Sequence, residues 1–500
     1  MSGRGKGRWL LNSFLMRMLP AGMARQQPVL PAIRQHLPSQ GEGSSEQIGD
    51  RFSVRILRAA GWTMSGYLGV QILRIASSLI LTRLLVPEMF GLMAVATMVQ
   101  VAVAMLSDLG IRPAAIQSRM GDRQAYLDTA WTLQIVHGLT IWVVCVGVAF
   151  AITAANARGL FPKGSVYTEP VLPAVIVATC FCTVIAGFQS TKVISAYREL
   201  ALAQITKIEV IAQIVSLGIA IILAVTTGSV WSFVVAILSA SAVTTGLSFL
   251  LLPGPGNRLR LEPAAVRDLV RFGKWVLLSS TFTVLAANGD RILLAGWISP
   301  RELGLYILAF NLILMLEGAG NRLFSSVAIP ALSKIHRDQP DRLPITFSKL
   351  RLPFDLLFVI AAGATFAAGD VVVNVLYDQR YEAAGQMLKI LSFSLLISRF
   401  GVLSNVYLAI GKPRYLTILN FVRSVSIFIL LPLGHYLYGL EGALWAIALH
   451  GLPGVVMLVA INSRYGFNNP RLEVVVLFGW AAGWLLGQIA RWGTHVVGFN

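Results

Sequence analysis

The chain has 500 residues, of which 56% are hydrophobic and 13% charged, with a net charge of +18 and a mean hydropathy of +0.70. So apolar a composition excludes a soluble protein built from several polar-surfaced domains. The Lys and Arg residues stand at the ends of apolar runs, which is typical of membrane topology and argues against a nucleic-acid partner.

Residues 1–57 differ from the rest of the chain. They are basic at the start, carry the short apolar stretch "WLLNSFLM" and continue into a Pro-, Gln- and Ser-rich segment. We predict a largely disordered cytoplasmic leader with an amphipathic turn at the membrane surface. A signal peptide is an alternative, although no clear small-residue cleavage site follows the apolar stretch. A second alternative is that translation starts at Met23, so that the preceding residues are not part of the protein.

Apolar runs long enough to cross a hydrocarbon core of about 30 Å recur along the remaining sequence, and backbone hydrogen bonding in lipid makes each of them a helix. The sequence therefore predicts an all-α polytopic membrane protein. We expect thirteen spans, with twelve or fourteen as alternatives, at residues 59–83, 90–110, 128–153, 170–190, 206–226, 229–252, 273–297, 303–330, 352–377, 385–410, 415–437, 439–462 and 472–491.

The expected spans divide into domains. Residues 58–252 form an N-terminal six-helix bundle, 253–272 a cytoplasmic linker, 273–462 a C-terminal six-helix bundle and 463–500 an extra C-terminal span. Lys and Arg concentrate in the loops on the side of the amino terminus, so the positive-inside rule places that terminus in the cytoplasm. The opposite loops are short, so they leave no room for an external catalytic domain.

A weak internal repeat relates the two bundles. "VPEMFGLMAVATMV" (86–99) aligns with "SPRELGLYILAFNL" (299–312), and both stretches link the first and second spans of a six-span set. The matched pairs are Pro87 with Pro300, Gly91 with Gly304, Leu92 with Leu305 and Ala96 with Ala309. Because six is even, the halves share one orientation and are related by a pseudo-two-fold axis along the membrane normal, around a central cavity.

Ionisable residues inside the spans are the candidate functional residues, because each costs about 2.5–3.5 kcal/mol near the bilayer centre on insertion scales. They leave an excess of positive charge, which suits an anionic cargo such as a diphosphate, whose oxygens match the arginine fork. The candidates for substrate binding are Arg74, Arg291, Arg322, Arg399 and Arg423, and those for ion pairing or coupling are Asp290 and Glu317. The alternative is an interhelical ion-pair network that only stabilises the bundle.

Uncharged polar residues within the spans are weaker candidates. They either line a sugar path or form interhelical hydrogen bonds, and they are Gln100, Gln134, His137, Asn311, Asn321, Asn405 and His450. The three cysteines lie in apolar runs and are expected to be buried thiols. The sequence holds no phosphate-binding GxxxxGK[ST] loop, no HExxH motif and no Cys/His cluster, so we expect no cofactor, no metal and no catalysis.

Several stretches resemble the Wzx-type polysaccharide flippases of the multidrug/oligosaccharidyl-lipid/polysaccharide exporter superfamily. They are "TRLLVPEMFGLMAVATMVQVAVAMLSDLGIRPAAIQSR" (82–119), "NGDRILLAGWISPRELGLYILAFNL" (288–312) and "AIPALSKIHRD" (328–338) followed by "KLRLP" (349–353). The resemblance implies two six-helix bundles, often with two further C-terminal spans. The long leader and the single extra span depart from that pattern.

The resemblance also implies a function. Such a protein moves polyprenyl-diphosphate-linked oligosaccharide across the bacterial cytoplasmic (inner) membrane for exopolysaccharide or O-antigen synthesis, with a polysaccharide polymerase and a chain-length regulator as partners. Two other readings stay open: an ion-coupled multidrug exporter of the same superfamily or a major-facilitator carrier, and a membrane polysaccharide polymerase. The polymerase requires a large outer loop, which the sequence lacks.

Overall fold

The computed structural model of the chain describes residues 69, 71–106, 111–118, 120–199, 201–269, 288–412 and 414–497, all within one compact unit that covers residues 59–500. The predicted leader lies outside the described residues. So do parts of the predicted first and seventh spans.

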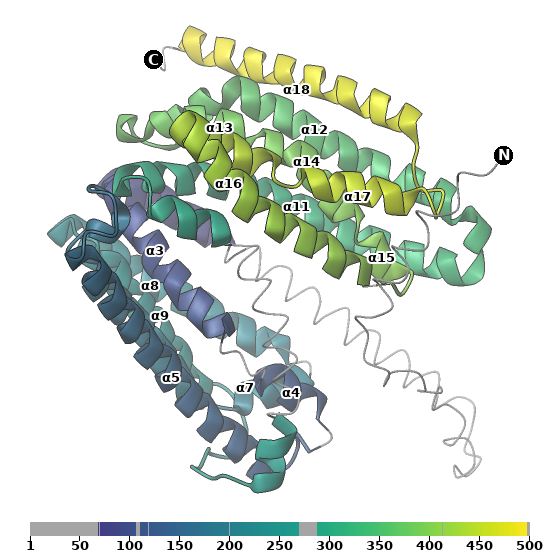
Figure 1. Ribbon diagram of the computed structural model, residues 1–500. Coiled ribbons are helices and arrows are strands. Elements are labelled where there is room, and N and C mark those ends of the chain that lie inside the picture. Colours follow the sequence, from purple (N-terminus) through teal and green to yellow (C-terminus); the bar gives the residue numbers. More distant parts are fainter. Residues whose placement is uncertain are drawn as a thin grey trace, which may run out of the picture. The chain divides into compact units, whose positions relative to one another are not determined.

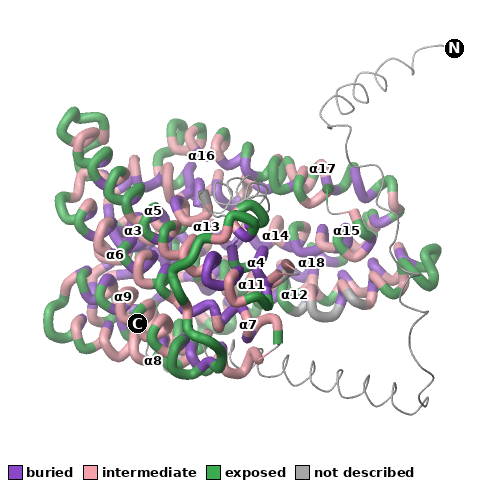
Figure 2. The backbone as a smooth tube through the Cα atoms, turned by 90° about the horizontal axis from the view of Figure 1, so that it is seen from below, coloured by how far each residue is buried: buried purple, intermediate pink, exposed green. Residues whose placement is uncertain are grey.

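All regular secondary structure in the described residues is helical, which confirms the predicted all-α fold (Figure 1). Eight of these helices are long and apolar enough to cross a membrane. The number of candidate spans rises to as many as ten if each of two bent helix pairs counts as one span. The chain is therefore a multi-pass membrane protein. Between 17% and 50% of each candidate span is buried by the protein itself, so much of the apolar helix surface is left for lipid (Figure 2).

The N-terminal half packs α5 on α6, α8 on α9 and α6 on α9, with α3 against α6. A bend of 68° between α6 and α7 breaks one candidate span. After a helical stretch at 71–84, its helices are α3 (Pro87–Leu106), α4 (Ile111–Gln117), α5 (Gln124–Ala157), η1 (Val166–Thr168), α6 (Leu172–Gly187), α7 (Lys192–Arg198), α8 (Leu202–Thr227) and α9 (Trp231–Leu250).

The C-terminal half contains two breaks: α13 and α14 meet at 42°, and α16 is interrupted at Tyr438 and Gly439. After a helical stretch at 288–295, its helices are α11 (Pro300–Asp338), η2 (Pro340–Arg342), α12 (Leu343–Leu376), η3 (Gln379–Tyr381), α13 (Ala383–Leu391), α14 (Phe393–Leu403), α15 (Val406–Ala409), α16 (Arg414–Leu449), α17 (Leu452–Asn462) and α18 (Pro470–Val497). The predicted extra span corresponds to α18, which packs along α12.

Local sequence explains where α11 begins. The Ser299 side chain accepts a hydrogen bond from the backbone N–H of Glu302, and the Glu302 carboxylate accepts one from the backbone N–H of Ser299. This capping box, with Pro300 at the first helical position, satisfies backbone donors that the helix itself leaves unpaired. The start of α11 is thereby fixed next to the start of α3.

The two repeat segments contact each other reciprocally where α3 and α11 cross. A Cβ atom at Gly91 would overlap the carbonyl oxygen of Pro300, and a Cβ atom at Gly304 would overlap the carbonyl oxygen of Pro87. These are the residues that the sequence repeat matches, Gly91 with Gly304 and Pro87 with Pro300. A two-fold relation produces reciprocal contacts of this kind, in which the Gly of each repeat meets the Pro of the other.

Further bonds join the halves on the same side, which the sequence predicts to be the outer one. Tyr381 Oη donates to the carbonyl of Leu85 at 2.7 Å, and the backbone N–H of Val166 donates to the carbonyl of Ile298 at 3.3 Å. Tyr167 Oη donates to the carbonyl of Ile292 at 3.1 Å. Among the described helices, α3 with α11 is the principal packing contact between the halves.

We expect Gly91→Ala to lower the free energy of unfolding by about 1–3 kcal/mol, because the added methyl group meets backbone rather than a movable side chain. Thermal unfolding of the purified protein in detergent measures this. Gly246→Ala is the matched control, since Gly246 lies within α9 with nothing within 4 Å of an added Cβ. Equal melting temperatures for Gly91→Ala and the parent protein would contradict the reciprocal contact.

Candidate functional site

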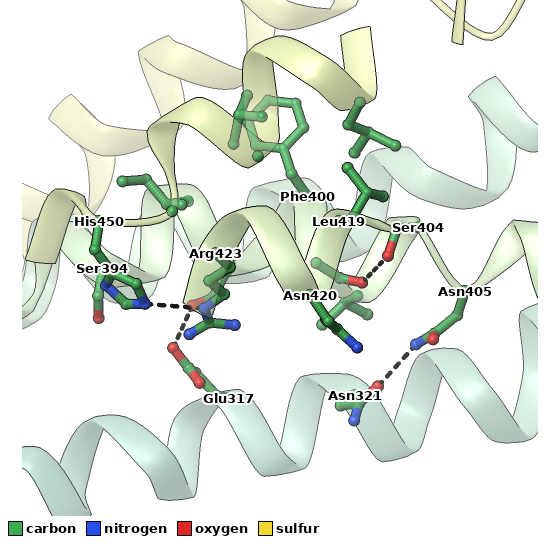
Figure 3. A pocket seen from close by; sticks show the side chains of 18 of the residues that line it. Glu317, Asn321, Ser394, Phe400, Ser404, Asn405, Leu419, Asn420, Arg423 and His450 are labelled. Atoms are coloured by element: carbon green, nitrogen blue, oxygen red, sulfur yellow. Dashed lines mark hydrogen bonds between the residues drawn. The ribbon is translucent and has the colours of Figure 1, made fainter. Parts of the chain in front are cut away.

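A cavity of about 400 Å³ with both polar and apolar walls lies within the C-terminal half, between α11, α14, α16 and α17 (Figure 3). Its volume is within the range of small-molecule sites, about 300–1,000 Å³. Apolar residues such as Leu416 and Val455 complete its wall. The polar side chains that line it are Glu317, Asn321, Ser394, Ser398, Ser404, Asn405, Asn420, Arg423 and His450.

The basic residue of this cavity is Arg423, on α16. Its Nε donates a hydrogen bond to His450 Nε2 at 3.0 Å, and His450 Nδ1 lies 2.6 Å from the carbonyl oxygen of Ile447. These contacts fit a neutral imidazole that donates through Nδ1 and accepts through Nε2. The terminal amino groups of Arg423 donate no hydrogen bond to a described residue, so they remain available to a ligand.

The acid of the cavity is Glu317, on α11. It accepts a hydrogen bond from Ser398 Oγ on α14, and it points toward Arg423 across the cavity (Figure 3). One turn along α11, Asn321 Oδ1 accepts a hydrogen bond from Asn405 Nδ2 at 3.1 Å. A carboxylate, a guanidinium and a row of amides and hydroxyls therefore share one space, which suits an anion bearing hydroxyl groups.

The structure gathers only part of the predicted candidates at this cavity. Of the charged residues, Glu317 and Arg423 line it, and of the uncharged ones Asn321, Asn405 and His450 do. Sequence reasoning missed Asn420 and the three serines. Asn420 lies three residues before Arg423, and Ser398 and Ser394 lie seven and eleven residues before Asn405; this helical spacing is the signal that was available. Gln134 instead donates to backbone carbonyls at the bend between α6 and α7.

Asp290 and Arg291 lie elsewhere, next to α11. The Asp290 carboxylate is buried and accepts a hydrogen bond from Tyr306 Oη. The Arg291 guanidinium carbon lies 5.6 Å from the centre of the Phe310 ring, a cation–π contact. Its Nε is buried without a hydrogen-bond partner among the described residues. The contacts of the two side chains are thus made to different residues of α11, Tyr306 for Asp290 and Phe310 for Arg291.

Arg74 and Arg322 are both exposed, and neither lines the cavity. Arg74 lies on the helical stretch 71–84 and Arg322 on α11. Their predicted contact with cargo stays a prediction.

Arg399 belongs to a buried ion-pair cluster that connects α12, α14 and α18. Its Nη1 lies 3.1 Å from Asp355 Oδ1 and its Nη2 lies 2.7 Å from Glu473 Oε2. Arg351 pairs with the same two acids, with Nε 2.7 Å from Asp355 and Nη2 2.5 Å from Glu473. Two bases thus meet two acids, and both terminal nitrogens of Arg399 face carboxylates of the protein. Sequence reasoning placed Arg351, Asp355 and Glu473 at span ends, although the i,i+4 spacing of the first two was visible.

The cluster predicts that Arg399 acts mainly on stability. The Asp355 side chain has 0% exposure, so Asp355→Asn leaves two buried guanidinium groups short of a partner. We expect a loss of about 3–5 kcal/mol in the free energy of unfolding, measured as a lower melting temperature of the detergent-solubilised protein. Arg399→Gln should destabilise similarly. A folded and fully stable Arg399→Gln protein that has lost only cargo binding would instead assign Arg399 to the cargo site.

Comparisons with known proteins fit this architecture. The chain is 24% identical over 344 residues to the lipopolysaccharide biosynthesis protein WzxC of Escherichia coli, and 27% identical over 163 residues to the amylovoran biosynthesis protein AmsL of Erwinia amylovora. These alignments cover 67% and 32% of this chain, and 66% and 42% of the relatives. The chain thus spans just under two thirds of the first relative and less than half of the second.

Solved structures of two transporters share the fold. The lipid II flippase MurJ in an inward closed conformation matches with a TM-score of 0.61 at 12% identity, covering 88% of this chain and 98% of MurJ. An inward-facing multidrug resistance transporter of the MATE family matches with a TM-score of 0.59 at 17% identity, covering 81% of this chain and 95% of the transporter. At these identities the likeness concerns the fold alone.

The family described as "Polysaccharide biosynthesis protein" matches residues 80–386, which is more than half of the chain and includes the α3–α11 crossing and Glu317. The chain belongs to this polysaccharide biosynthesis protein family.

Proposed function

We propose that the protein translocates polyprenyl-diphosphate-linked oligosaccharide repeat units across the cytoplasmic membrane for exopolysaccharide or O-antigen synthesis. The observation that carries this proposal is the cavity that holds Arg423, with its free amino groups, inside an apolar all-helical chain of a polysaccharide biosynthesis family. An arginine retained within such a chain is a functional candidate by default, because placing it there is costly.

The cavity offers separate groups to the two polar parts of such a cargo. The free amino groups of Arg423 suit a phosphate oxygen pair, which guanidinium forks bind in two parallel hydrogen bonds. Asn321, Asn405 and Asn420 supply amides, which both donate and accept and so suit sugar hydroxyls. At about 400 Å³ the cavity holds only part of an oligosaccharide, so the remainder of the cargo lies outside it.

Glu317 is the proposed coupling residue. An arriving anion competes with this carboxylate for Arg423, so cargo binding favours either protonation of Glu317 or a cation beside it. Asp290, held by Tyr306, is proposed as an ion-pairing residue. Arg291, Arg74 and Arg322 are proposed to contact the cargo outside the cavity.

Translocation also requires the two halves to separate on the side where α3 crosses α11. The contacts there combine a reciprocal backbone approach, hydrogen bonds from Tyr381, Tyr167 and Val166, and a buried apolar cluster shared by α3 and α11. A rocking motion of the halves, as in transporters built from repeats, breaks this set and opens the other face of the central space.

The proposal extends to the cellular setting. The membrane is the bacterial inner membrane, the amino terminus is cytoplasmic because of the Lys and Arg distribution, and the protein transports without catalysing a reaction. A polysaccharide polymerase and a chain-length regulator are the proposed partners. The names of the two relatives, which refer to lipopolysaccharide and amylovoran biosynthesis, support a surface-glycan context.

Arg423→Gln should reduce flipping of a polyprenyl-diphosphate oligosaccharide in proteoliposomes by about tenfold or more, because a charge-assisted bidentate contact is lost. Arg423→Lys should recover part of the rate, since it restores the charge without the fork. The measurement is protection of the lipid-linked sugar from an external enzyme over time, at matched amounts of folded protein.

Arg337→Gln is the matched control for this experiment, since Arg337 is an exposed arginine paired with its neighbour Asp338. Normal flipping by Arg423→Gln would contradict the site assignment. If the parent protein exports a cationic drug and leaves the lipid-linked sugar in place, the multidrug-exporter alternative is correct.

A further inference from the structure

A short extended segment between the halves has a built structure that the proposed transport does not use. Residues 256–262 ("GNRLRLE") follow α9 and cross the first turns of α5; we name them the strap. The backbone N–H groups of Arg258, Arg260 and Glu262 donate to side chains of Asp128, Thr132 and Thr129, at 3.1, 3.0 and 3.0 Å. The strap is therefore pinned at every second residue.

The α5 side of this zipper is itself fixed. The hydroxyls of Thr129 and Thr132 donate to the carbonyls of Ala125 and Asp128, four residues earlier, while they accept from the strap. At the start of the strap, Gln124 Nε2 donates to the carbonyl of Gly256 at 3.0 Å. The hydroxyls are thus oriented toward the strap by their own bonds within α5, and these bonds define the position of the strap on the helix.

Beyond the strap, helical residues 263–269 hold its far end. Ala265 and Leu269 are buried in a cluster with residues of α4, α5 and α7. Asp268 accepts hydrogen bonds from Ser118 Oγ and Tyr126 Oη, both at 3.0 Å. The strap is therefore held at both ends and along its length.

This pinning determines what the strap presents outward. In an extended segment whose alternate N–H groups face one partner, successive side chains point to opposite faces. Leu259 and Leu261 lie on one face, with exposed fractions of 72% and 61%, and Arg258 and Arg260 lie on the other, also exposed. Neither arginine side chain has a hydrogen bond or ion pair with a described residue.

The place of the strap indicates what covers it. The helix α5 has 34 residues. At a rise of about 1.5 Å per residue, a helix of this length extends about 51 Å. That length is well beyond a hydrocarbon core of about 30 Å. The first turns of α5, where the strap lies, are therefore at the level of the lipid headgroups or just outside it. Exposed leucines beside arginines at that level are the pattern of an interfacial anchor.

We propose that the strap anchors the N-terminal half to anionic phospholipid headgroups, with Leu259 and Leu261 inserted at the interface and Arg258 and Arg260 on the phosphates. The positive charge selects the occupant, because anionic headgroups attract each exposed basic residue near the surface. The anchor is distinct from the cavity and does not depend on the cargo. It fixes the depth of α5 in the membrane while the halves move.

The test uses the full-length Leu259→Cys protein, labelled with a bimane fluorophore, in nanodiscs of phosphatidylcholine or phosphatidylglycerol with brominated acyl chains. Cys145, Cys180 and Cys182 are buried, so labelling is selective for position 259. We expect quenching by brominated phosphatidylglycerol to exceed that by brominated phosphatidylcholine by about twofold or more. Raising the salt concentration should reduce this preference through screening.

Variants assign the preference to the strap. Arg258→Gln together with Arg260→Gln should abolish it, and both changes leave the backbone bonds to α5 intact. Arg158→Gln, an exposed arginine at the other end of α5, should leave it unchanged. Equal quenching by the two lipids in the parent protein would overturn the proposal. Quenching by aqueous iodide with none by either lipid would also overturn it and make the strap a surface for a soluble partner.

Discussion

A charge surrounded by hydrocarbon must find a partner or a polar space, and this constraint arranges the C-terminal half. Arg351 and Arg399 meet Asp355 and Glu473 in a closed set of ion pairs, so their charge serves to join α12, α14 and α18. Removing one member leaves the others buried and uncompensated, which costs more than the set contributes. Arg423 follows the other route, because it faces a cavity where Glu317 is its main acidic neighbour.

The same constraint explains why α18 is an integral part of this half. At one end Glu473 completes the ion-pair cluster, and at the other Arg491 pairs with Asp370 of α12, which also binds Lys389 at 3.0 Å. Ion pairs at both ends therefore hold α18 against its neighbours. The two halves meet at the α3–α11 crossing, where a close backbone approach at Gly91 and Gly304 lies beside a buried cluster of apolar side chains from both helices.

Hydropathy was sufficient to predict the all-α membrane fold, because every backbone group in lipid must be satisfied within its own helix. The repeat of Pro87 and Gly91 in Pro300 and Gly304 also predicted a pseudo-two-fold relation, and the structure brings these four residues together. Hydrophobic periodicity could not show the surroundings of each charge. It indicates which face of a helix a residue occupies, but not which other helix packs against that face. Arg399 and Arg423 look alike in sequence, and the approach of acids on α12 and α18 to Arg399 separates them. The break at Tyr438 and Gly439 coincides with the expected boundary between two spans.

The central claim is that the cavity beside Arg423 receives the cargo, and the accessibility of a single position tests it most directly. Asn420 lines the cavity and is exposed, and the native cysteines are buried. Alkylation of Asn420→Cys by a water-soluble maleimide should therefore proceed in the purified protein and slow severalfold when a polyprenyl-diphosphate oligosaccharide is added. The lipid without its diphosphate sugar should give no protection. Equal alkylation rates with and without the lipid-linked oligosaccharide would contradict the account.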